Sequence, residues 1–400
     1  MDWQTTPEDS VPSTLVPGTE LGTLGKPPVT GAWRPGDHPG ARQFEALGEQ
    51  WVRGGQLPAV RVAYETWGTL DAERSNAVLV LHALTGDSHV AGAPGPGHRT
   101  AGWWNDVVGP GLAIDTDRWF VVAPNMLGGC QGTTGPSSLA PSGGEWGSRF
   151  PFLTIRDQVE VQRQLADRLG IEVFAAVVGG SMGGMHALEF AVTHPSRVQR
   201  LAVLASTAQT TADQIAANSL QRAAIQMDPA FAGGDYYEAD AGEGPHRGLA
   251  LARRMALMTY RAPDELNGRF ARSWQSDVSP LGDDGRFSVE SYLDFHGNKF
   301  TRRFDASSYV TLTHAMDSHD VGAGRGGVAA ALGQVTARTL VVGVSSDRLF
   351  PIEDQHRIAA GVPDALDGGE AAAIDSEFGH DGFLIEHEQV GAHLRRLLEA

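Results

Sequence analysis

The sequence predicts an α/β protein in which a mostly parallel sheet is covered by helices on both faces. Short apolar runs typical of buried strands alternate with stretches typical of helices. One such strand leads through a Gly-x-Ser-x-Gly turn, residues 179–183, directly into a helix. A long segment without strand patterns, residues 208–330, interrupts the alternation. These observations indicate a core formed by residues 46–207 and 331–400, with a helical insertion.

Composition narrows the class of protein. A chain of 400 residues with 41% hydrophobic residues can bury a large core. The net charge of −17 argues against a general nucleic-acid or anionic-membrane surface. The single cysteine, Cys130, cannot form an internal disulfide, which suits a reducing compartment. With no signal-peptide pattern at the N-terminus and no long apolar run, we expect a cytoplasmic protein.

The elements follow in order along the chain. Residues 1–45, rich in Pro, Gly and Thr, predict a mobile tail that passes into edge structure. Alternation or continuous apolar runs predict strands at residues 60–66, 77–81, 119–123, 174–178, 198–205, 338–344 and 371–374. Helical patterns occupy residues 157–170, 184–193, 211–227 and 248–260.

Ser181 lies in the strand–turn–helix context in which Gly-x-Ser-x-Gly marks a catalytic nucleophile. The turn is so tight that glycine is needed beside the serine. The following helix N-terminus favours developing negative charge near Ser181 Oγ. The alternative is a glycine-rich turn whose serine only caps the helix. The complete context favours the nucleophile.

A serine nucleophile needs a base, and that base needs an orienting group. Asp347 directly follows a predicted strand, and His380 lies in a loop after the next one. The order Ser, acid, His is the order expected after such a turn. Of the later histidines, His356, His387 and His393 lie in helical patterns, which leaves His380. Taken singly, Asp347 could be a turn former and His380 a surface residue.

Two backbone N–H groups are expected to bind the oxyanion. One belongs to Met182, directly after the nucleophile. The other comes from the loop after an early strand, residues 82–86, where we assign Leu84. The alternative for this loop is tight packing around Gly86.

Several stretches together resemble the homoserine O-acyltransferases, chiefly those that transfer acetyl groups. Leu-Gly-Gly-Cys, beginning at Leu127, and Gly-His-Asp-Gly-Phe, beginning at Gly379, are the most selective. The matching stretches are residues 82–86, 127–138, 179–185, 218–225, 299–306, 346–351 and 379–384. They cover nearly all of residues 50–400 in the right order.

The resemblance implies an α/β-hydrolase fold with a helical lid at residues 208–330 and a homodimer formed through the lids. It implies no metal and no bound cofactor. Ser181 would take an acetyl group from acetyl-CoA, and the hydroxyl of L-homoserine would then receive it, as a step of methionine biosynthesis. The resemblance also points to Arg222 for the substrate carboxylate and to Asp381 for its ammonium group.

Other interpretations stay open at the level of sequence. The donor could be succinyl-CoA, the acceptor could be serine, or water could take the acyl group as in an esterase. A non-catalytic binding protein could keep the same fold and pocket. Cys130 is better explained as a small buried residue than as a nucleophile. The glycine-rich residues 322–327 do not follow a strand, so we interpret them as a turn and not a phosphate loop.

Overall fold

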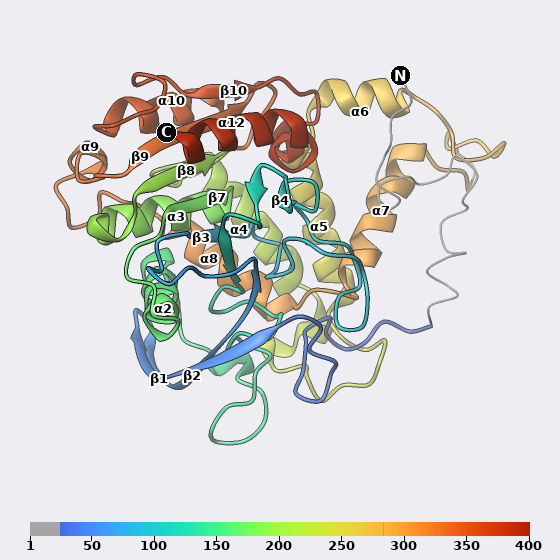
Figure 1. The fold of residues 1–400 in the computed structure, drawn as a ribbon. Helices are drawn as coiled ribbons and strands as arrows, with labels where there is room; N and C mark the ends of the chain where they lie inside the picture. Colours follow the sequence, from blue (N-terminus) through green and yellow to red (C-terminus); the bar gives the residue numbers. More distant parts are fainter. Residues whose placement is uncertain (1–24, 283) are drawn as a thin grey trace.

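One sheet organises the chain in the computed structural model, which describes residues 25–282 and 284–400 (Figure 1). Its eight strands follow the order β1-β2-β6-β3-β7-β8-β9-β10. Pairing is antiparallel between β1 and β2 and between β2 and β6, and parallel across the rest. The strands are β1 Gln43–Val52, β2 Gly55–Trp67, β3 Ala77–Leu81, β6 Phe120–Pro124, β7 Ala176–Gly180, β8 Arg200–Leu204, β9 Arg338–Val344 and β10 Ala372–Ile374.

The central strands are apolar because both of their faces are covered. Every residue of β3 and of β7 is buried. Alternate side chains enter two separate cores: Val177 belongs to one and Val178 to the other. The first core lies against α2 (Ile155–Arg168) and α3 (Met182–Thr193), and the second against α12 (His387–Glu399).

The remaining elements of the core are short, apart from α10. A two-stranded sheet joins β4 (Val108–Gly109) to β5 (Ile114–Asp115). Its strands were not predicted, because two residues carry no readable alternation. The other elements are η1 Gly147–Arg149, η2 Pro195–Arg197, α10 Ile352–Gly361, η4 Gly379–Asp381 and α11 Gly382–Ile385.

Between β8 and β9 the described residues form helices and connecting loops. These helices are α4 Ala212–Gln226, η3 Pro229–Gly234, α5 His246–Tyr260, α6 Pro263–Phe270, α7 Ser288–Phe300, α8 Ala306–Asp317 and α9 Val328–Leu332. Helix α4 packs against α5 and α8, and α5 packs against α7. Figure 1 shows α6 and α7 on the side of α5 away from the sheet.

The expected fold class is confirmed, and each predicted strand lies within a few residues of one in the structure, but the edge strand β1, Gln43–Val52, was not predicted. The part of the predicted tail at residues 1–24 lies outside the described residues. Residues 25–42 lie before β1, and they include Thr30, whose hydroxyl donates to Asp305 Oδ1 at 2.7 Å. Among the described helices, none has the length and apolar composition needed to cross a bilayer.

Candidate active site

Ser181 occupies the turn between β7 and α3 with φ 57° and ψ −126°, a conformation that costs a non-glycine residue energy. The surrounding backbone holds it there. The N–H of Ser181 donates to Leu204 O at 2.9 Å, and the hydroxyl of Ser206 donates to Ser181 O at 2.8 Å. A Cβ atom at Gly183 would lie 2.0 Å from Leu81 O, so only glycine fits.

The structure brings Ser181, His380 and Asp347 into one hydrogen-bonded chain. His380 Nε2 lies 2.8 Å from Ser181 Oγ, and His380 Nδ1 lies 2.7 Å from Asp347 Oδ2. All three side chains are buried. Elements distant in sequence supply them: the β7–α3 turn, the loop after β9, and η4. This arrangement can move a proton from the serine hydroxyl to the imidazole.

Asp347 is held so that one carboxylate oxygen faces His380. Its Oδ1 accepts the N–H groups of Leu349 at 2.8 Å and Phe350 at 3.0 Å, which leaves Oδ2 for the imidazole. Burial alone would lower the pKa of His380, but the charge and hydrogen bond of Asp347, with the charge of Asp381, raise that pKa above its ordinary value.

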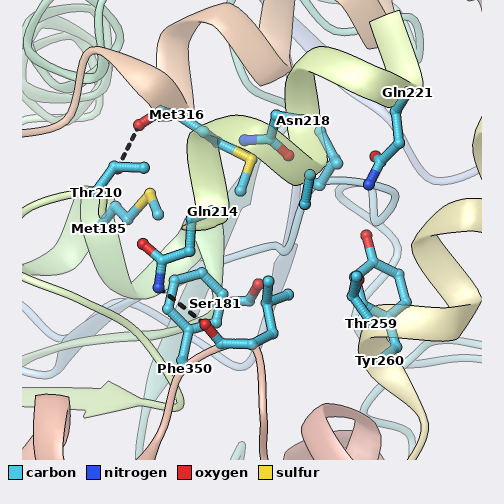
Figure 2. Close-up of a pocket in the computed structure, with 13 residues that line it drawn as sticks. Ser181, Met185, Thr210, Gln214, Asn218, Gln221, Thr259, Tyr260, Met316 and Phe350 are labelled. Carbon is cyan, nitrogen blue, oxygen red and sulfur yellow. Dashed lines mark hydrogen bonds between the residues drawn. The ribbon is translucent and has the colours of Figure 1, made fainter. Parts of the chain in front are cut away.

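A cavity opens directly above Ser181. Its empty space is about 400 Å³, including the solvent at its mouth. Figure 2 shows Gln214, Asn218 and Gln221 of α4 lining it together with Tyr260 of α5. Its described lining residues include none with a formal charge: they are Leu84, Ser181, Met185, Thr210, Gln214, Ala217, Asn218, Gln221, Thr259, Tyr260, Met316, Leu349 and Phe350.

Both residues assigned to the oxyanion hole lie at this cavity or next to it. Met182 is the first residue of α3, and the N–H of that position has no acceptor within the helix. Leu84, in the loop after β3, lines the same cavity as Ser181.

Arg222 and Asp381 both have charged protein partners. Arg222 Nη2 lies 2.6 Å from Asp317 Oδ2, while its Nη1 is buried without a hydrogen-bond partner. Asp381 directly follows His380 in the chain, and its Oδ2 lies 3.2 Å from Arg261 Nε. Neither residue is part of the cavity lining. The structure therefore brings Asp381 beside the chain of Ser181, His380 and Asp347 and leaves Arg222 outside the cavity lining.

Arg253 is a further cation beside the cavity that the sequence did not single out. Its guanidinium carbon lies 5.6 Å from the centre of the Tyr260 ring, and its Nη1 is buried and unpartnered. Tyr260 lines the cavity, with its ring centre 5.7 Å from that of His380. Burial raises the pKa of Tyr260, and the charges of Arg253 and Asp381 act on it in opposite directions. Arg253 and Tyr260 are seven residues apart on a predicted helix, a spacing that places them on one face.

Cys130 is buried with 3% of its surface exposed, and burial raises the pKa of its thiol far above the ordinary range. A thiol in this state is a poor nucleophile. Its placement agrees with the interpretation of Cys130 as a small packing residue.

One group among the described residues has the composition of a metal site. Ligand atoms of Glu65, His89 and His98 lie within 4.8 Å of one another. The two imidazoles are stacked, however, with ring centres 3.8 Å apart and planes inclined by 11°. A metal ion lies near the plane of each imidazole that binds it, and two stacked planes cannot share one ion. These rings therefore do not fit a common metal as they stand.

Comparison with known proteins supports this architecture. Residues 76–385 match the family described as alpha/beta hydrolase fold. Homoserine O-acetyltransferase of Clavibacter michiganensis subsp. michiganensis is 67% identical, over 94% of this chain and 97% of that protein. The crystal structure of homoserine O-acetyltransferase from Bacillus anthracis is similar with a TM-score of 0.81 and 28% identity, over 90% of this chain and 97% of that one. The structure of the acetyl esterase MekB is similar with a TM-score of 0.76 and 26% identity, over 90% of this chain and 97% of that one.

Proposed function

Because the chain belongs to the homoserine O-acetyltransferase family of α/β hydrolases, we propose that it transfers an acetyl group from acetyl-CoA to L-homoserine through an acetyl-Ser181 intermediate. The observation that carries this proposal is the buried chain from Ser181 through His380 to Asp347, at the base of a cavity.

In the first half-reaction His380 Nε2 takes the proton of Ser181 Oγ as that oxygen attacks the thioester carbonyl. The N–H groups of Met182 and Leu84 bind the oxyanion that forms. The tetrahedral intermediate then collapses, the C–S bond breaks, and His380 gives its proton to the departing CoA sulfur. Asp347 keeps the imidazole in the tautomer that this exchange needs.

In the second half-reaction the side-chain hydroxyl of homoserine takes the place of CoA. His380 accepts its proton while the oxygen attacks the acetyl carbon. Collapse releases O-acetylhomoserine and returns the proton to Ser181 Oγ. All groups in these steps come from the protein and its two substrates, so the proposed mechanism uses no resident metal or cofactor. We propose that it serves methionine synthesis in the cytoplasm.

The cavity lining favours acetyl over succinyl as the transferred group. A succinyl group ends in a carboxylate, which needs a cation or several donors when it is buried. No described lining residue is charged, so a succinyl carboxylate would find only neutral donors there, such as the amides of Gln214, Asn218 and Gln221. Parallel kinetics with acetyl-CoA and succinyl-CoA test the choice, and a higher kcat/KM for succinyl-CoA would overturn it. Replacing homoserine with serine tests the acceptor in the same assay.

The acceptor is a zwitterion, and we propose that charged groups behind the lining hold it. Arg222 retains one buried guanidinium nitrogen without a partner, suited to a carboxylate. Asp381, beside His380, suits the ammonium group. Arg253 offers a second unpartnered guanidinium nitrogen, closer to Tyr260.

Mass spectrometry of the protein mixed briefly with acetyl-CoA tests the central step. The wild-type chain should gain one acetyl group on Ser181, and L-homoserine should remove it. Ser181→Ala should abolish both the acetylation and the transfer to homoserine. His380→Ala should reduce them almost as much, because the residues of a triad act as a unit and their losses do not add. Full activity in either variant would mean that other residues carry the reaction.

A second candidate is an acetyl hydrolase, which the structural likeness to the acetyl esterase MekB favours. Water would then replace homoserine at the acetyl-Ser181 stage. Thiol release from acetyl-CoA, followed with and without L-homoserine, separates the two activities. Release at the same rate in both conditions supports the hydrolase and overturns the transferase.

We also propose a homodimer formed through the helical insertion. Helices α4 and α5 pack together and expose a set of large apolar side chains, which indicates a protein interface. These are Ile215, Leu220, Met227, Leu251 and Met258. Analytical ultracentrifugation should find a dimer that Leu220→Glu together with Met227→Glu dissociates. A monomeric wild-type chain would exclude it.

A further inference from the structure

The loop that carries Leu84 has little regular structure of its own. It leaves β3 at Leu81 and extends to Ser88, with a single internal turn in which Gly86 N–H donates to Ala83 O at 2.9 Å. A donor of an oxyanion hole must be held in place before the reaction, since displacement of about 1 Å can cost about 100-fold in rate. The contacts that fix this loop therefore bear on catalysis.

Two consecutive residues after β6 hold the two ends of the loop. The N–H of Met126 donates to His82 Nε2 at 3.1 Å. At the other end Ser88 N–H donates to Asn125 Oδ1 at 2.9 Å, and Asn125 Nδ2 donates to Ser88 Oγ at 3.0 Å. Asn125 is itself fixed, because its N–H donates to Ala63 O and its carbonyl accepts the Thr133 hydroxyl.

Ser88 has one further partner, the carboxylate of Glu65 on β2. The Ser88 hydroxyl donates to Glu65 Oε1 at 2.7 Å, so this hydroxyl both accepts and donates. Glu65 has no exposed surface. A fully buried carboxylate is costly unless its hydrogen bonds and charge are satisfied. Because burying the Glu65 carboxylate costs free energy, we expect this residue to have a role beyond packing.

Two neighbouring histidines, His89 and His98, contact the Glu65 carboxylate. His89 Nδ1 lies 3.0 Å from Glu65 Oε2. Burial opposes a charged ring, but the hydrogen bond and charge of Glu65 raise the pKa of His89 above its ordinary value. His98 Nε2 accepts the N–H of Ala41 at 3.1 Å and lies 3.5 Å from Glu65 Oε1, and burial lowers the pKa of His98. Of the two stacked rings, His89 is therefore the one whose charged form Glu65 stabilises more.

We propose that Glu65 is a positioning residue of the active site, which acts through Ser88 to hold the Leu84 N–H in place for the oxyanion. This rests on the proposed acyl transfer through Ser181. Glu65 touches neither substrate nor Ser181 in this assignment. Its effect passes through one hydroxyl, Ser88 Oγ, to the loop that ends at Ser88 and carries Leu84.

The test measures acylation of Ser181 in the full-length protein with two donors, acetyl-CoA and p-nitrophenyl acetate. Ser88→Ala and Glu65→Ala should each slow acylation by about tenfold to hundredfold, with KM unchanged. The double variant should be no slower than the slower single variant, because both changes break one chain of contacts. Glu65→Gln keeps an oxygen that can accept the Ser88 hydroxyl, so it should retain most of the wild-type rate.

Thr339→Val is the matched control. Thr339 is also buried, and its hydroxyl donates to Ala337 O at 2.8 Å on β9, away from the loop. It should lower the melting temperature without slowing acylation. If Ser88→Ala fails to fold, the comparison of Glu65→Ala with Glu65→Gln carries the test.

Three results would overturn the proposal. These are wild-type acylation rates in the folded alanine variants, losses that multiply in the double variant, or a Glu65→Gln variant as slow as Glu65→Ala. A wild-type protein that p-nitrophenyl acetate acylates but acetyl-CoA does not would refute the proposed function alone. Acylation by p-nitrophenyl acetate would still test the positioning role of Glu65.

Discussion

At the scale of single residues, the protonation state of His380 decides in the proposed mechanism whether Ser181 can react. Only the neutral imidazole can accept the serine proton. Asp347 and Asp381 raise the pKa of His380 above its ordinary value of 6.5, against the effect of burial. Acylation should therefore increase as pH rises through a pKa above 6.5 and fall on the acid side. A pH profile of kcat/KM for acetyl-CoA checks this directly.

Asp347→Asn provides the matching variant. Without the carboxylate charge the pKa of His380 should decrease, so the acid limb of the profile should move to lower pH. The rate should also fall by about 10⁴-fold, because the amide no longer fixes the tautomer, a magnitude known from other serine triads. An unmoved acid limb would show that another group sets the profile.

The proposed acceptor site gives a second prediction at this scale. Arg222→Ala and Asp381→Asn should still acetylate Ser181 but raise the barrier to transfer onto homoserine by about 2–5 kcal/mol. Single-turnover measurements from isolated acetyl-enzyme give that rate. Arg253→Ala is the comparison: a selective loss there, with normal transfer in Arg222→Ala, would move the carboxylate anchor to Arg253.

Sequence could predict Ser181, Asp347 and His380 because each follows a readable strand and their order along the chain is informative. Their mutual distances support the assignment. The ion pairs of Arg222 with Asp317 and of Arg261 with Asp381 could not be predicted. Each partner lies on a different element, and only the packing of the insertion brings them together.

At the scale of elements, the strands were predictable because burial on both faces produces uninterrupted apolar runs. The boundaries of the helices were less predictable. The predicted helix at residues 184–193 begins in the structure at Met182. Gly183 and Gly184 look like turn residues in the sequence, but they lie in the first turn of α3. These helical positions are glycine because β3 and Ser206 approach too closely for a side chain.

Gly183→Ala tests this close approach. The new Cβ would meet Leu81 O at 2.0 Å and Leu81 C at 2.7 Å, both backbone atoms that cannot rotate away. Helix α3 must shift, so stability should fall by about 1–3 kcal/mol or more, and acylation of Ser181 should be largely lost. Urea unfolding and the acylation assay measure the two effects.

Gly268→Ala is the control for that variant. Gly268 lies within α6, and a Cβ there meets nothing within 4 Å. Alanine at this position should stabilise the protein by about 0.5–1 kcal/mol, because glycine is the poorer helix former. A Gly183→Ala protein with stability and activity similar to Gly268→Ala would contradict the packing argument.

At the scale of the whole molecule, buried neutral histidines couple stability to pH. Burial, with smaller effects from His82 and His319, lowers the pKa of His186 to about 3. Unfolding restores an ordinary value of 6.5, so the unfolded chain binds more protons between these values. Stability should therefore fall as pH decreases from about 6.5 toward 3, by about 1.4 kcal/mol for each unit from this one group.

His186→Gln isolates that contribution. The variant should be less stable at pH 7, because the ring contacts with Met182 O and Gln158 are lost or altered. Its stability should nevertheless depend less steeply on pH between 6 and 4 than that of the wild type. Urea unfolding at several pH values gives both slopes, and equal slopes would show that His186 does not titrate on unfolding.

The buried state of Cys130 has a practical consequence. It is the only sulfhydryl in the chain, and burial keeps it protonated and shielded from reagents. A maleimide dye would therefore find no native attachment point, and a cysteine introduced at an exposed position outside the proposed dimer interface, such as Val278 between α6 and α7, would carry the label alone. Fluorescence from that single probe could then follow, in real time and during turnover, whether the helical insertion moves.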